Sequence, residues 1–225
     1  MGNVTQMAPL GNWFDGLLSV FKRAAPIVSV GDVEDFIDRH AAFGVQKCII
    51  EYCRARAGIQ WSKLFKEKEF LEALDAARWK AFGIGVGNVT EMVDATLRPH
   101  AGDKRNQLVD ALTSCGRHVL QRYPLPGGFA EDFWAGEIAA FETRMAKVKM
   151  RAPHAVRFIP VESSHAFFAF VPIHADLRGL DFEMIQNNLR VNLCRSYETF
   201  IKRADEAAVV ADLLRPAAPV KVPAL

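Results

Sequence analysis

The sequence predicts an all-α protein, a bundle of five or six helices with one proline-rich crossover and no substantial sheet. Apolar residues recur at three- and four-residue spacing through most of the chain, which is the period of a helix with one buried face. Glycines and prolines punctuate these periodic segments, as they do where helices end. Half of the 225 residues are hydrophobic and 24% are charged, which is the composition of a globular domain.

We expect three parts: an amphipathic arm at residues 1–28, a helical-bundle domain at 29–214 and a mobile tail at 215–225 that is rich in proline. An amphipathic helix can dock on its own domain, bind a partner or lie on a bilayer surface. Only two basic residues flank the apolar face of the arm, so the bilayer is the weakest of these choices. The apolar face of this interaction arm consists of Trp13, Phe14, Leu17, Leu18 and Phe21.

The domain is predicted to open with a helix over residues 29–57. Ser29 can cap its first amides, Asp32 follows in the first turn, and Gly58 ends it. Apolar residues lie on two of its sides, so we expect this helix at the centre of the domain.

A long helix is predicted next, from Glu67 to about Leu97, although three glycines lie in its middle. Inside a helix each glycine costs about 1 kcal/mol relative to alanine. Either the helix breaks there or the missing side chains let another backbone come close. A nucleotide-binding loop is disfavoured because no strand precedes the glycines. We favour a groove for a crossing helix at Gly83 and Gly87.

The remaining helices are expected at residues 103–121, 131–150 and 182–214, the last one capped by Asp181. The stretch 151–178 carries three prolines and cannot be one long helix.

Charge and hydropathy exclude several classes of protein. The chain has 28 basic and 26 acidic side chains, so no strong global field favours nucleic acid or anionic lipid. No apolar run reaches the roughly 18 residues of a membrane span. No secretion signal is evident, so we expect a cytoplasmic protein. The four cysteines lack metal-ligand spacing and are expected to be reduced and buried, and we predict no metal and no cofactor.

Two features could carry hydrolytic chemistry or ligand binding. Ser164 and His165 are adjacent and would be the catalytic residues of a serine hydrolase, although adjacency rarely gives the required geometry. The simpler interpretation is that Ser164 caps the apolar helix that follows it. Polar residues on the two central helices form either an internal network, in which Glu51 could pair with Arg195, or the polar floor of a pocket. They are Gln46, Glu51, Tyr52, Asn188, Asn192 and Arg195.

A basic run covers residues 144–157, with no acidic residue between Glu142 and Glu162. It could bind the phosphates of RNA or of anionic lipids. The helix dipole alone also favours cations near a helix C-terminus. No aromatic platform accompanies the basic run, so nucleic-acid binding is the least expected of the functions considered.

The segment Ala41–Gly58, together with Trp79, the stretch 171–173 and residues 181–188, resembles a small all-helical family of alphaproteobacterial proteins. The similarity covers roughly residues 30–205. Members often carry the label "esterase" without an established mechanism, so the resemblance implies a bacterial helical protein and assigns no catalytic residue.

The leading hypothesis is a non-enzymatic interaction or adaptor protein, peripheral to a membrane or to a larger complex. Its expected partners are another protein or a second copy of the chain, with a peripheral membrane contact as an option. The alternatives are an esterase-like hydrolase or a binder of a small lipid-like molecule between the central helices, and binding of RNA or anionic lipid through residues 144–157.

Overall fold

The computed structural model describes residues 25–215. Over this range the chain is all-α, as predicted, with nine α-helices and no strand. Five helices of 17 to 30 residues form the body. They are α2 (Val30–Ala57), α4 (Lys68–Leu97), α5 (Arg105–Gln121), α6 (Phe133–Lys149) and α9 (Phe182–Arg203).

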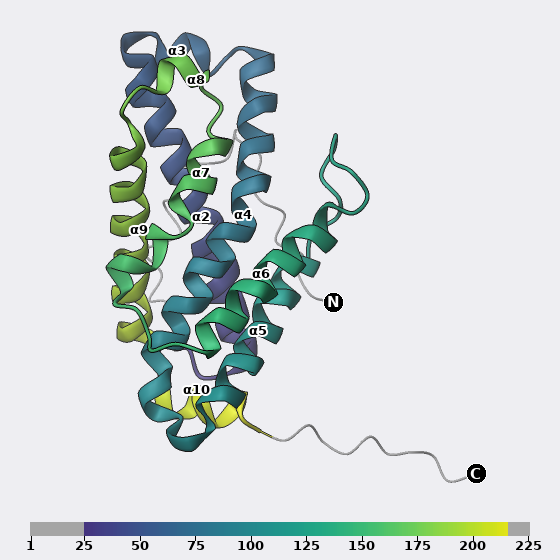
Figure 1. Cartoon of the computed structure of the whole chain (residues 1–225), viewed down its shortest axis with the longest axis vertical. Helices are drawn as coiled ribbons and strands as arrows, with labels where there is room; N and C mark the ends of the chain where they lie inside the picture. Colours follow the sequence, from purple (N-terminus) through teal and green to yellow (C-terminus); the bar gives the residue numbers. More distant parts are fainter. Residues whose placement is uncertain (1–24, 216–225) are drawn as a thin grey trace, which may run out of the picture.

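The shorter helices connect and close this body. They are α3 (Trp61–Leu64), α7 (Ser164–Phe170), α8 (Ala175–Arg178) and α10 (Glu206–Leu213), with short 3₁₀ segments between several of them. In Figure 1, α2, α4 and α9 run along the long axis while α5 and α6 cross them obliquely. Helices α3 and α8 lie together at one end, and α10 lies at the other.

Helix α2 begins and ends where the sequence predicts. The Ser29 hydroxyl accepts from the Asp32 amide at 3.2 Å, and the Asp32 carboxylate accepts from the Ser29 amide at 3.0 Å. This reciprocal capping box satisfies two amides that have no partner inside the helix. Gly58 ends the helix with a positive φ of 51°.

Helix α4 continues unbroken through its glycines, and the predicted close approach of another helix is confirmed. A side chain at Gly83 would overlap the Glu137 carboxylate, and one at Gly87 would meet Arg144 at 2.8 Å, both from α6. On another side, a Cβ at Gly85 would lie 2.7 Å from Val45 of α2. The glycines therefore allow α4 to be approached closely from two directions.

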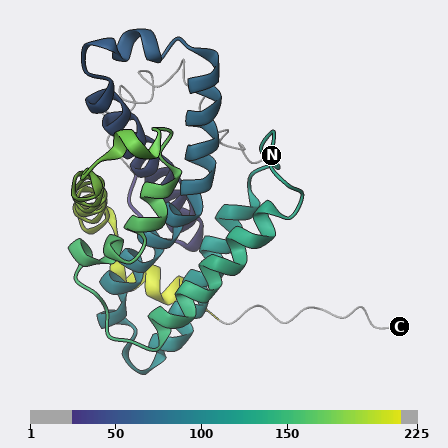
Figure 2. The same ribbon diagram turned by 45° about the horizontal axis from the view of Figure 1, so that its top comes forward.

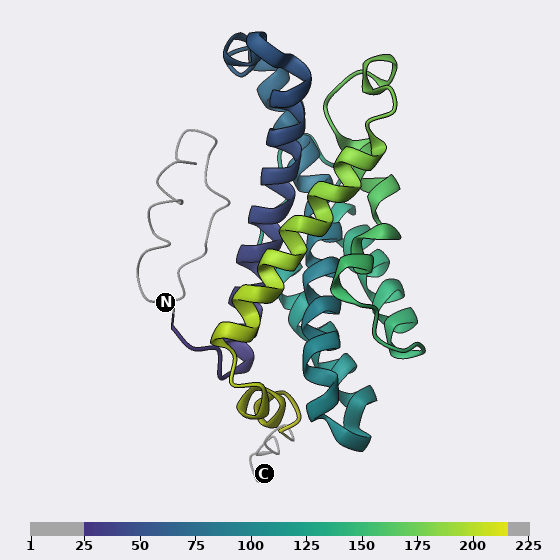
Figure 3. The same cartoon turned by 90° about the vertical axis from the view of Figure 1, so that its left-hand side faces the viewer.

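The core is divided along the length of the bundle. The larger apolar cluster joins the first half of α2 and the second half of α4 to α5, α6, α10 and the end of α9. The smaller one joins the remaining halves of α2 and α4 to α7 and the start of α9, near the end where α3 and α8 lie. Figure 3 shows α2 and α9 side by side on one face of the molecule.

The last predicted helix is split, which corrects the expected span of 182–214. Ile27 is completely buried and forms an isolated parallel bridge with Ala204. Asp205 then caps α10 by accepting from the Ala208 amide at 3.0 Å. Asp181 occupies the predicted N-cap position of α9, but its carboxylate makes no capping bond and accepts from Tyr52 instead. Residues 1–24 of the predicted arm and 216–225 of the predicted tail lie outside the described residues.

Candidate interaction surface

The predicted catalytic residues Ser164 and His165 are not brought together. Ser164 is completely buried, and its hydroxyl donates to the Val161 carbonyl at 2.8 Å and accepts from Gln186 at 3.2 Å. His165 is exposed, with its ring stacked 4.0 Å from that of Phe182. Ser164 is also not the cap of α7: it is the first residue of that helix, and its hydroxyl bonds backwards to the preceding 3₁₀ segment.

A serine–histidine contact does occur elsewhere, between α9 and α2. Ser196 Oγ lies 2.9 Å from His40 Nδ1, and the hydroxyl also donates to the Asn192 carbonyl at 3.1 Å. Burial, with the nearby charges of Arg203 and Arg39, lowers the pKa of His40 to about 4. The adjoining cavity has about 30 Å³, which suits a single water molecule rather than an ester. The geometry therefore describes a neutral structural histidine.

The predicted polar network is only partly assembled. Glu51 pairs with Lys47 at 3.5 Å, and Arg195 is exposed, so the expected Glu51–Arg195 pair is wrong. α9 contacts α2 through Ser196. Because neighbouring residues of a helix are about 100° apart around its axis, Arg195 points away from α2. Asn192 is buried in the wall of the small cavity.

The other members of that set lie apart from it. Gln46 and Asn188 are half-buried. Tyr52 is buried and donates to Asp181 at 2.9 Å. The six residues therefore do not converge on one pocket.

The basic run is largely neutralised within the fold. The buried carboxylate of Glu91 on α4 accepts from Arg144 and Arg151, at 2.9 and 2.8 Å respectively. Lys149 pairs with Asp110 at 2.7 Å. The sequence hides this arrangement because Glu91 lies more than 50 residues before its partners. Within the run, only Lys147 and Arg157 remain as exposed cations without a described ion pair.

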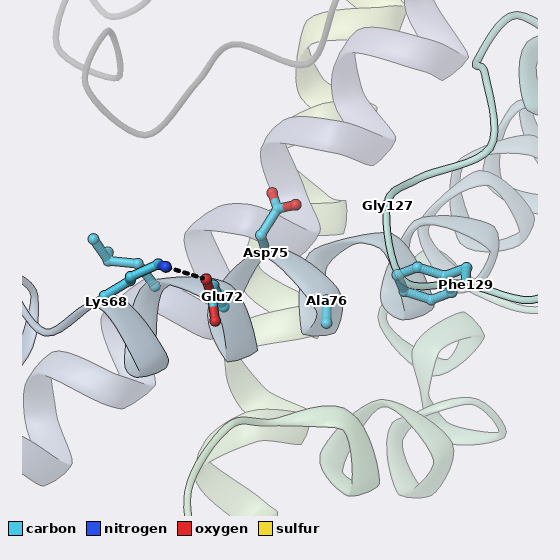
Figure 4. A pocket seen from close by; sticks show the side chains of 7 residues that line it. Lys68, Glu72, Asp75, Ala76, Gly127 and Phe129 are labelled. Carbon is cyan, nitrogen blue, oxygen red and sulfur yellow. Dashed lines mark ion pairs between the residues drawn. The ribbon is translucent and has the colours of Figure 1, made fainter.

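A groove of about 320 Å³ lies between the first turns of α4 and the loop that precedes α6 (Figure 4). Its charged side chains already have partners: Lys68 pairs with Glu72 at 3.6 Å, and Asp75 with Arg78 at 3.1 Å. Across residues 25–215, no group of three potential metal ligands comes together. None of the described helices is long and apolar enough to cross a membrane.

The most distinctive surface feature is a pair of glycine turns at one end of the bundle. Gly58 ends α2 and Gly179 ends α8 with nearly the same backbone geometry, φ 51° with ψ −130° and −134°. Each turn places an aliphatic residue in solvent: Ile59 is 92% exposed and Leu180 is 99% exposed. Both turns lie at the end that carries α3 and α8 in Figures 1 and 2.

Polar contacts hold the two turns together. Arg56 donates to the Leu177 carbonyl, and its Nε lies 3.2 Å from a carboxylate oxygen of Asp181. The same carboxylate accepts from the Tyr52 hydroxyl, and burial with this bond raises the pKa of Tyr52 to about 12. The exposed apolar residues are thus carried on loops that are fixed to α2.

We call this surface the apolar tip. An isolated exposed aliphatic residue is ordinary, so the feature of interest is that several lie at the same end of the bundle. The sequence signal that was overlooked is a glycine followed by a large aliphatic residue at two helix ends. The members of the tip are Ile59, Trp61, Leu177, Leu180 and Met184, each at least 40% exposed.

Comparisons with protein-family models, with curated proteins and with solved structures find no match to this chain. Its function is therefore inferred from its own geometry and chemistry.

Proposed function

We propose that this chain is a non-enzymatic interaction protein, an adaptor that attaches to a partner surface through its apolar tip. The observation that carries the proposal is the exposure of Ile59 and Leu180 on two glycine turns that Arg56 ties together. When a partner removes such side chains from water, the complex is stabilised by roughly 25 cal/mol for each Å² of apolar surface that is buried.

A second contact element supports the adaptor interpretation. The chain enters the described region at Ala25, whose carbonyl accepts from Arg203 at the C-terminal end of α9. The apolar tip lies at the opposite end of this helix, which has 22 residues and therefore spans about 33 Å. The described chain therefore begins at the end of the bundle that lies away from the apolar tip.

The proposal predicts that the apolar tip is covered in the cell. Three of the four cysteines are buried and Cys194 is half-buried, so a Cys194→Ser chain is a suitable background for labelling. In this background, Leu180→Cys should react with a membrane-permeant maleimide several-fold more slowly in cells of the encoding organism than as purified protein. Met150→Cys, at a position 87% exposed and away from the tip, is the matched control.

Equal protection of the two positions would contradict the proposal, because crowding alone would then account for the slower reaction. The experiment does not depend on what covers the apolar tip, since it reports only whether Leu180 is covered.

A further inference from the structure

We infer that the surface covering the apolar tip is an anionic membrane interface, into which the two glycine turns insert. This inference rests on the proposed function and specifies its partner. It is carried by the shape of the apolar tip, by the charges beside it and by the position of one tryptophan.

The shape of the apolar tip favours a fluid partner. Ile59 and Leu180 project almost completely from separate turns, and neither of the two cavities described above is lined by a residue of the apolar tip. A protein partner would need a separate, matched pocket for each projecting side chain, since strong interface contacts are well packed. Acyl chains accommodate projecting aliphatic groups without such a match.

The charges beside the apolar tip favour an anionic surface. The stretch 54–68 contains five basic residues and one acidic residue. Lys63 and Lys66 are exposed and make no ion pair with any described residue. On the α8 side the acidic groups include Asp181, which Arg56 neutralises, and exposed Asp176 and Glu183. Lys63 and Lys66, beside α3, are therefore the cations that could meet anionic headgroups without first breaking a described ion pair.

Trp61 lies two residues after Ile59 and two residues before Lys63 in the chain. Its indole is 40% exposed, and the Arg54 guanidinium lies 4.2 Å from the ring centroid. Tryptophan is enriched where hydrocarbon meets headgroups because one end of the ring is apolar and the other carries an N–H donor. A guanidinium above such a ring can contact phosphates while its stem stays on apolar surface. Aliphatic, aromatic and cationic side chains therefore follow one another closely in the chain at this end of the bundle.

The test is co-sedimentation of the full chain with vesicles of phosphatidylcholine alone, or with one-third phosphatidylglycerol. We expect binding to the anionic vesicles that weakens as salt is added. The double variant Ile59→Ser/Leu180→Ser should lower the partition coefficient by about tenfold or more, because two aliphatic side chains no longer leave water. Lys63→Gln/Lys66→Gln should lower binding to anionic vesicles only. Met150→Ser is the control for loss of an exposed apolar residue elsewhere.

The amphipathic arm is the competing source of binding, and the variant Leu17→Ser/Phe21→Ser in the full chain separates the two. If this variant loses vesicle binding while the tip variant Ile59→Ser/Leu180→Ser keeps it, the inference is overturned. Circular dichroism checks that each variant is folded, which the exposure of the tip residues leads us to expect. If Leu180 is protected in cells but the unmodified chain binds neither vesicle, the proposed function stands and the membrane inference is wrong.

Discussion

Glu91 shows how one buried residue can reorganise a whole stretch of sequence. It is 1% exposed on α4, yet it receives the guanidinium groups of Arg144 and Arg151. Ser163 and Arg144 also donate to Asn88, one turn earlier on α4, at 3.0 and 2.9 Å. The basic run therefore connects the end of α6 and the crossover to α4 through ion pairs. For this reason it does not form a continuous cationic surface.

Replacing this carboxylate should be costly. Glu91→Gln leaves two largely buried guanidinium groups without their shared counter-charge, and we expect the free energy of unfolding to fall by about 3 kcal/mol or more. Glu142→Gln is the matched control: its ion pair with Arg117 at 2.6 Å is 40% exposed on both sides, and its loss should cost about 1 kcal/mol or less. Denaturant unfolding of the two variants measures both losses. Equal losses would show that burial of the Glu91 ion pairs adds nothing to the stability of the protein.

His40 makes stability dependent on pH in the acidic direction. Burial lowers its pKa from 6.5 to about 4 in the folded protein. As the pH falls below about 6.5, the unfolded chain takes up a proton that the folded chain refuses, so stability is lost until the pH nears 4. His40→Asn should reduce the stability lost between pH 7 and pH 5 by an amount on the order of 1 kcal/mol.

Glu137 acts in the opposite direction. Burial between α6 and Gly83 of α4 raises its pKa from 4.5 to about 7. Above pH 4.5 the unfolded chain releases a proton that the folded chain keeps. The free energy of unfolding therefore decreases as the pH rises from 4.5 towards 7. We therefore expect Glu137→Gln to stabilise the protein more at pH 7 than at pH 4.5, as measured by chemical denaturation. The reverse order would mean that the carboxyl is ionised in the folded state.

At the scale of helices, the glycines of α4 mark where other helices come close. Gly83 and Gly87 face α6, whereas Gly85, between them in sequence, faces α2. The sequence predicted the close approach at the first two because small residues four apart share one helical face. The contact at Gly85 was not predicted, because this residue lies about 200° around the helix from Gly83 and therefore belongs to another face.

Two glycine substitutions separate packing from helix propensity. A Cβ at Gly85 would lie 3.1 Å from the Ala41 backbone carbonyl, which cannot rotate away, so Gly85→Ala should destabilise the protein by about 1–3 kcal/mol. A methyl group at Gly44 of α2 would meet no neighbouring side chain or helix within 4 Å, so Gly44→Ala should stabilise the protein by up to about 1 kcal/mol. Thermal and denaturant unfolding of both variants tests this, and a stabilising Gly85→Ala would refute the close packing of α2 on α4.

For the whole molecule, the cysteines report on global unfolding. Cys48, Cys53 and Cys115 are buried in the two core clusters, and burial raises the pKa of each thiol, to about 12 for Cys53 and Cys115. Only the half-buried Cys194 should react measurably with a maleimide in the native full chain, and all four should react in denaturant. Fast native labelling of more than one thiol, located by mass spectrometry, would show that part of the core is open.

The sequence by itself determined the all-α class and the start and end of α2, and it favoured an unbroken α4. Helical periodicity and capping are local properties of the chain, so they can be recognised without knowing its partners. Only the tertiary structure decided that Ser164 and His165 diverge, that Glu91 neutralises the basic run, and that Gly58 and Gly179 bring Ile59 and Leu180 to one end. These outcomes depend on which helix faces meet, and that is fixed by contacts between residues far apart in sequence.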